Sequence, residues 1–250
     1  YPGPPPWLSA AHELPLSAES GYDAPRFVAE CMAAFLALGL APRRAADAAA
    51  NAMGEAAWGA AVHHGNAGGW KITKGHAAAW RAANGPDGPK WWKAAGNADS
   101  EDSPWCFYRA FPSLADFLRE WPAHFVPKPG DTAPYPAYRA AGAAFWAGDP
   151  EWFCHLILAG YKGAPSKRLL LRLRAAGKPD TDHPSVRDHR SIAGRVLRMW
   201  AQSRLGVEAD GKWGPKSRAE CCAVQRGAGL AETGELDDAT LAALAPGGGP

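Results

Sequence analysis

Apolar side chains recur at intervals of three and four residues near the start of the chain, which is the spacing of one helix face. The first such run extends from Phe27 to Leu36. Gly39 and Pro42 then interrupt the pattern, and Pro42 is well placed to open a second helix. The pattern therefore predicts two consecutive helices, the second of them over residues 43–58.

The second predicted helix is rich in alanine and places small residues along one stripe. Ala48, Ala52, Glu55 and Gly59 follow one another there at helical spacing. Small side chains let a helix approach its neighbours closely, so we expect this stripe to carry Glu55 into the core or beside it.

Residues 63–93 are rich in Gly, Asn, Trp and Lys, which indicates loops with short turns, the usual place for binding residues. Helical patterns return after them in three segments, and no segment shows sustained two-residue alternation, so strands should be few. The sequence therefore predicts a mostly α fold. The three segments are residues 113–125, with Ser113 as the cap, 138–145 and 150–161.

A polar, proline-containing stretch separates this part from the C-terminal quarter of the chain. We predict a first domain over residues 1–175, a linker over 176–190, a second domain over 191–246 and a disordered tail at 247–250. Helices of the second domain are expected at residues 192–205, 215–225 and 237–244.

Composition narrows the classes of function. The net charge of +2 argues against a nucleic-acid binder that relies on bulk charge. The sequence contains no run of about eighteen apolar residues, so no membrane span is predicted. The five cysteines are odd in number and contain no Cys-x-x-Cys pair, which favours free thiols. The histidines His63, His64 and His76 lack the His-Glu-x-x-His spacing of metallopeptidases, so neither a metal nor another cofactor is predicted.

The second predicted domain carries a series of short motifs. They are Asp210-Gly211, Trp213-Gly214-Pro215, Ser217, Val224-Gln225, Gly229-Leu230, Gly234 and Thr240-Leu241 with Leu244. In this order and spacing they resemble the peptidoglycan-binding-1 family of three-helix wall-binding modules, over essentially the whole domain. The resemblance implies peptidoglycan as a partner. Trp213 is the candidate for stacking on the wall, and packing inside the module is the alternative.

A second resemblance lies in residues 45–73. Its residues are Glu55, Trp58 and Gly59, then Asn66, Gly69, Lys71 and Ile72, with Trp70 added. They are similar to the flagellar-type glucosaminidase family (glycoside hydrolase family 73), whose signature is Glu-x-x-Trp-Gly followed by an Asn-containing loop. Segments 107–121 and 145–161 resemble later stretches of that family, so the resemblance covers about residues 25–162. It implies a lysozyme-like helical catalytic domain.

Cleavage of a glycosidic bond needs a carboxylic acid that protonates the leaving oxygen. The resemblance assigns this role of general acid to Glu55, and exclusion of water by Trp58 would favour the protonated form. Relatives supply a second carboxylate further along the chain. The candidates for it are Glu101, Asp87, Asp99 and Asp102.

Three mechanisms stay open. Glu101 serves as the base of an inverting hydrolysis, the N-acetyl group of the substrate serves as the nucleophile, or Glu55 alone drives lytic transglycosylation. The family's tyrosine, in a Y-A-T-D-P stretch, falls at Trp146 in this chain. Groove candidates, each with packing as the alternative, are Trp58, Asn66, Trp70 and Tyr161.

The sequence therefore predicts a peptidoglycan hydrolase of the glucosaminidase kind, a bacteriolytic or endolysin-like enzyme that works as a monomer. It is expected to act at the bacterial cell wall, by secretion to it or by delivery from a phage or secretion system, and no signal peptide is visible in the sequence. The alternatives are a lytic transglycosylase or muramidase that uses the same site, and a catalytically silent peptidoglycan-binding protein.

Overall fold

The computed structural model describes residues 13–15, 22–57, 62, 66–67, 90–94, 105–109, 111–131, 136–159, 161 and 184–246. Helices make up most of these residues, which confirms the prediction of a mostly α chain. The elements in chain order are β1 (Glu13–Pro15), α1 (Ala24–Ala37), α2 (Pro42–Glu55), β2 (Lys90–Ala94), β3 (Trp105–Arg109), α4 (Leu114–Phe125), the 3-10 turn η3 (Pro136–Tyr138), α5 (Arg139–Trp146), α6 (Trp152–Leu158), α8 (Pro184–Arg204), α9 (Pro215–Gly227) and α10 (Asp238–Leu244).

The first two helices begin at the signals that the sequence contains. Asp23 caps α1, and its carboxylate accepts a hydrogen bond from the backbone N–H of Arg26 at 2.8 Å. Pro42 occupies the first turn of α2, as predicted. However, α2 ends at Glu55 rather than near residue 58, because the backbone of Ala57 turns to a positive φ of 46°.

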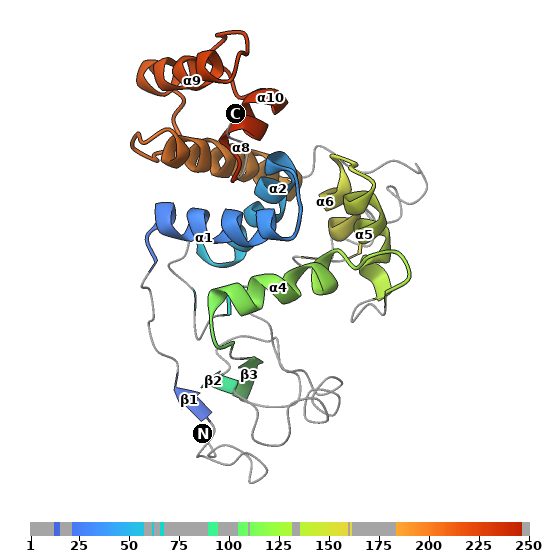
Figure 1. Ribbon diagram of the computed structural model, residues 1–250. Coiled ribbons are helices and arrows are strands. Elements are labelled where there is room, and N and C mark those ends of the chain that lie inside the picture. Colours follow the sequence, from blue (N-terminus) through green and yellow to red (C-terminus); the bar gives the residue numbers. More distant parts are fainter. Residues whose placement is uncertain are drawn as a thin grey trace.

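Three strands form a small sheet at the opposite end of the described molecule from α9 and α10 (Figure 1). Strand β1 runs parallel to β2, and β2 runs antiparallel to β3, with Lys90 paired to Arg109. The prediction of loops over residues 63–93 is wrong at its end, where β2 begins at Lys90. Strand β2 contains Trp91 and Trp92, and aromatic residues favour strand structure.

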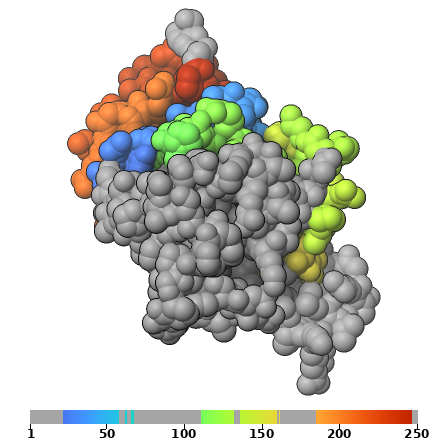
Figure 2. Space-filling model, turned by 90° about the horizontal axis from the view of Figure 1, so that it is seen from below, coloured from blue at the N-terminus to red at the C-terminus, as the bar shows by residue number. Residues whose placement is uncertain are grey.

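The core of the helical part centres on Trp121 of α4. Its indole is fully buried and meets the rings of Phe35, Phe145 and Trp152 edge-on, with centroids 5.2, 6.2 and 6.2 Å away. These rings come from α1, α5 and α6, so one side chain touches three helices besides its own. Helices α1 and α4 lie side by side (Figures 1 and 2). The predicted cap of α4 is confirmed, since Ser113 accepts from the N–H of Asp116 at 3.2 Å.

Helix α8 begins at Pro184, inside the segment predicted to be a linker, and runs for 21 residues. It packs along α2, α1 and α6 (Figure 1). The ring of His189 stacks on Phe153 at 3.8 Å, and Arg190 forms an ion pair with Glu151 at 3.1 Å. The described charged residues of the predicted linker, Arg187, Asp188 and Arg190, are exposed on this helix. The division of the chain into domains stays a prediction.

Two buried glutamines repeat the same contacts in the C-terminal helices. The side-chain oxygen of Gln202 accepts from the N–H of Gly211 at 2.7 Å, and its nitrogen donates to Ser217 Oγ at 3.2 Å. Gln225 makes the equivalent bonds to Gly234 N, 2.9 Å, and to Thr240 Oγ1, 2.9 Å.

Each glutamine lies at the same sequence distance from its partners, nine residues before the glycine and fifteen before the hydroxyl. Both glycines adopt positive φ, 77° for Gly211 and 67° for Gly234, where L side chains are strained. The motifs of the C-terminal segment are thus two copies of one unit, in which a helix glutamine ties down the turn that follows it.

Helices α2 and α10 are also joined directly. Arg43, on α2, donates to Asp238 Oδ1 at 2.5 Å and to the carbonyl of Leu236 at 2.6 Å.

None of the helices that the structure describes has the length and apolar character needed to cross a membrane. The four cysteines whose side chains are described, at positions 31, 154, 221 and 222, are free thiols.

We expect Gln225→Leu to lower the free energy of unfolding by roughly 2–4 kcal/mol, because it leaves the buried N–H of Gly234 and nearby hydroxyls without their partner. Urea unfolding measures the effect. The control Arg226→Leu removes only an exposed ion pair to Glu232 and should cost less than about 1 kcal/mol. Equal effects of the two substitutions would contradict the assigned role of Gln225.

Candidate functional site

Glu55 is the last residue of α2, and its side chain is half-buried. The hydroxyl of Tyr161 donates a hydrogen bond to Glu55 Oε1 at 2.5 Å. Tyr161 is held in turn by the end of α6, where its backbone N–H donates to the carbonyl of Leu156 at 3.0 Å. A bond of this kind closes a helix C-terminus. Two helix ends, far apart in sequence, thus meet at one carboxylate.

The contact between Tyr161 and Glu55 continues into the core. Asn51, one turn before Glu55 on α2, donates from Nδ2 to the phenolic oxygen of Tyr161 at 2.7 Å. The indole N–H of Trp121 donates to Asn51 Oδ1 at 2.9 Å. Asn51 is 2% exposed and Trp121 is fully buried, so the chain of hydrogen bonds leads from the centre of the core to a carboxylate at its rim.

Aromatic rings surround the phenol of Tyr161. Phe125, Phe153 and Tyr138 lie with ring centroids 5.5, 5.8 and 6.4 Å from it. Burial and the neighbouring charge of Glu55 hold the pKa of Tyr161 well above its usual range. The phenol therefore keeps its proton at neutral pH and acts as a donor toward Glu55.

A small pocket borders the same part of α2. Its volume is about 60 Å³, which suits a few water molecules and is too small for a sugar ring. Asn51 therefore both lines this pocket and bonds to Tyr161. The lining includes Asn51, Gly54, Phe153, Ser185, Asp188 and His189, from α2, α6 and α8.

Of the other predicted site residues, the structure describes Asn66 and Trp213. Asn66 is 1% exposed. The indole N–H of Trp213 donates to the carbonyl of Gly234 at 2.9 Å, so this tryptophan takes part in the packing of the C-terminal helices. A contact of Trp213 with the wall stays a prediction. Trp58, Trp70 and Glu101 lie outside the described residues, as do Asp87, Asp99 and Asp102.

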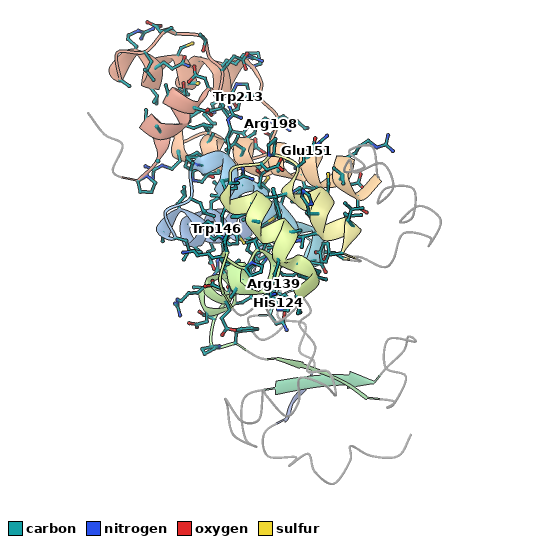
Figure 3. The ribbon with its side chains drawn as sticks, turned by 90° about the vertical axis from the view of Figure 1, so that its right-hand side faces the viewer. His124, Arg139, Trp146, Glu151, Arg198 and Trp213 are labelled. Carbon is teal, nitrogen blue, oxygen red and sulfur yellow. The ribbon has the colours of Figure 1, made fainter. Side chains whose placement is uncertain are left out.

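Trp146, at the position of the family tyrosine, is an anchor between helices. Its indole N–H donates to the carbonyl of Val126 at 2.7 Å, and the ammonium of Lys128 lies 4.9 Å above its ring. Figure 3 shows Trp146 and Trp213 in different parts of the molecule. The phenol that reaches Glu55 comes instead from Tyr161, at the far end of the next helix.

Two residues of this hydrogen-bonded chain, Asn51 and Trp121, are not among the site residues predicted from the sequence. A signal for Asn51 is present, because an amide on the alanine-rich helix falls one turn before Glu55 and needs a hydrogen-bonding partner if it is buried. No comparable signal marks Trp121, whose spacing fits an ordinary core residue.

Asp47 lies two turns before Glu55 on α2. Burial raises its pKa to about 6, although Arg44, at 3.7 Å, acts in the opposite direction. Among the described residues, no group of three or more His, Cys, Asp or Glu side chains is arranged to hold a metal ion.

Comparison with known proteins identifies no relative. No family model matches the chain, and neither the curated proteins nor the solved structures contain a significant match.

We predict that Tyr161→Phe lowers the free energy of unfolding by about 1–3 kcal/mol, because it removes the acceptor of the buried Asn51 amide and the donor to Glu55. Urea unfolding at pH 7 measures the change. The control Tyr22→Phe removes a hydroxyl that bonds to Glu30 at a more exposed position and should cost clearly less. A Tyr161→Phe protein as stable as wild type would show that the hydroxyl contributes nothing to the fold.

The raised pKa of Asp47 predicts a pH dependence of stability. The folded chain holds this proton more tightly than the unfolded chain, whose aspartates titrate near about pH 4. The protonated Asp47 carboxyl therefore contributes its full share to the free energy of unfolding below about pH 4, and this contribution is lost as pH rises through about 6. We expect Asp47→Asn to flatten the decline in unfolding free energy between these values. The control Asp131→Asn, on an exposed turn, should leave the slope unchanged.

Proposed function

We propose that this protein is a peptidoglycan hydrolase that cleaves the glycan strand by acid catalysis, with Glu55 as the general acid. The observation that carries the proposal is the short hydrogen bond from the buried phenol of Tyr161 to the half-buried carboxyl of Glu55. A half-buried carboxyl at a helix end, held by a phenol that is itself packed among aromatic rings, keeps a fixed orientation and part of its surface exposed.

The proposed chemistry follows from this placement. The protonated carboxyl of Glu55 transfers its proton to the glycosidic oxygen as the bond to the anomeric carbon breaks. The carboxylate that forms is then stabilised by the donor of Tyr161, since a hydrogen bond to a charged acceptor is stronger than one to a neutral acceptor. Tyr161 therefore favours the state that follows proton transfer.

The sequence motifs support the choice of substrate. The Glu-x-x-Trp-Gly motif at Glu55 resembles that of the flagellar-type glucosaminidases, and a lysozyme-like fold for this part of the chain is included in the proposal. The tyrosine of that family falls at Trp146 here, and we propose that Tyr161 supplies the phenol in its place.

The C-terminal helices add a second argument for a wall substrate. Residues 191–246 resemble a peptidoglycan-binding module, and we propose that they hold the protein on the wall as a three-helix unit. Helix α8 packs on α2, and Arg43 bonds to the start of α10. A strand bound by the C-terminal helices would thus be held at a fixed distance from Glu55, rather than on a flexible tether.

Digestion of purified peptidoglycan by wild type and by Glu55→Gln tests the proposal. We expect the substitution to lower the rate at least about 100-fold, because the amide cannot give up a proton. The matched control Glu151→Gln changes a half-buried glutamate that pairs with Arg190, away from these hydrogen bonds, and should retain the wild-type rate. Digestion by Glu55→Gln at the wild-type rate would contradict the assignment.

The ends of the released fragments identify the reaction. Reducing GlcNAc ends establish a glucosaminidase, reducing MurNAc ends a muramidase, and anhydro ends a lytic transglycosylase that needs no second carboxylate. Wall binding by a wild-type protein that releases no fragments would leave a peptidoglycan-binding protein without catalysis.

A further inference from the structure

The hydrogen bonds that join Trp121, Asn51, Tyr161 and Glu55 run in one direction, and the donor at the buried end decides which. An indole N–H donates and cannot accept. The atom of Asn51 that lies 2.9 Å from Trp121 Nε1 must therefore be the amide oxygen. A carboxamide could otherwise be turned by half a rotation without a change of shape, so Trp121 alone fixes its orientation.

The orientation of the amide decides the next bond. With Oδ1 facing Trp121, the Nδ2 group of Asn51 faces Tyr161 and donates to its oxygen at 2.7 Å. A phenol has a single proton, and that proton cannot point at a donor. It is turned instead to Glu55 Oε1, 2.5 Å away.

We propose that Asn51 is a positioning residue that acts through Tyr161 to place the transferable proton of Glu55 on Oε2. Oε1 accepts from the phenol, and in a protonated carboxyl the carbonyl oxygen is the better acceptor, so the acidic proton resides on the other oxygen. The inference rests on the proposed function, because the location of this proton matters for acid catalysis. It adds a defined direction of proton delivery.

The same arrangement makes the buried amide act on the reaction without touching the substrate. Once Oε2 has given its proton to the leaving oxygen, the bond from Tyr161 to Oε1 becomes charge-assisted. That gain exists only while the phenolic proton points at Glu55, and Asn51 enforces this direction. Asn51 therefore favours the transition state over the ground state.

The substitution Asn51→Asp tests the proposal because it keeps the shape of the side chain. A carboxylate at this position accepts from Trp121 and from Tyr161 at once, so the phenolic proton turns away from Glu55. We expect kcat for wall digestion to fall about 10- to 100-fold with KM unchanged. The control Gly54→Asp places the same charge at an exposed position of α2, outside these hydrogen bonds, and should keep most of the wild-type kcat.

A proton NMR measurement tests the direction of the bond without any assay of activity. The phenolic proton of Tyr161 is assigned by its loss in Tyr161→Phe. We expect Glu55→Gln to shift this resonance in the wild-type background and to leave it unmoved in the Asn51→Asp background, where the proton points at residue 51. A resonance that does not respond to Glu55→Gln in the wild-type background would overturn the proposal, and this comparison needs no substitution of Asn51.

The kinetic result has its own opposing outcome, since equal kcat values for Asn51→Asp and Gly54→Asp would also overturn the positioning role. Failure of the proposed function has a different signature. In that case Glu55→Gln digests the wall as wild type does, whereas the NMR comparison still reports the direction of the hydrogen bonds.

Discussion

The indole of Trp121 packs its ring against aromatic side chains and donates its N–H to an amide. Both the core and the candidate site depend on this pair of interactions. Its ring packs edge-on against aromatic side chains of α1, α5 and α6, such as Phe35 and Trp152. Its one polar group meets Asn51 Oδ1. A buried tryptophan needs a partner for its N–H, and a buried amide needs one for its oxygen. Each satisfies the other, and the amide nitrogen is left to face Tyr161.

The alanine-rich surface of α2 brings these groups within reach of one another. Eight residues of this helix are buried, and all but Asn51 and Met53 are alanines. Short side chains let α1 and α8 approach the helix axis closely, so α2 packs against both of them. The helix can hold Glu55 at the rim of the core because Ala57 ends it by turning to a positive φ.

In the C-terminal helices, too, buried polar side chains satisfy one another's hydrogen bonds. Gln202 and Gln225 each satisfy a turn glycine and a hydroxyl, so two copies of one unit hold the three helices together. The first of these helices is also a neighbour of α2. Helix α8 thus packs both against α2 and against α10. Helix packing and the bonds of Arg43 then set the position of Glu55 relative to the C-terminal helices. In the proposed function, a wall strand bound by those helices lies at a fixed distance from Glu55.

The sequence by itself determined the helical class, the apolar face of α1, the start of α2 at Pro42 and the choice of Glu55 as the candidate acid, because these depend on residues close together in the chain. It gave no account of α8 before residue 192, since charges on the outer face of a helix resemble those of a linker. Only the tertiary structure decided which groups surround Glu55. Tyr161 lies 106 residues from it and Trp121 lies 70 residues from Asn51. Hydrogen bonds over such separations depend on how helices pack, and local periodicity carries no record of that packing.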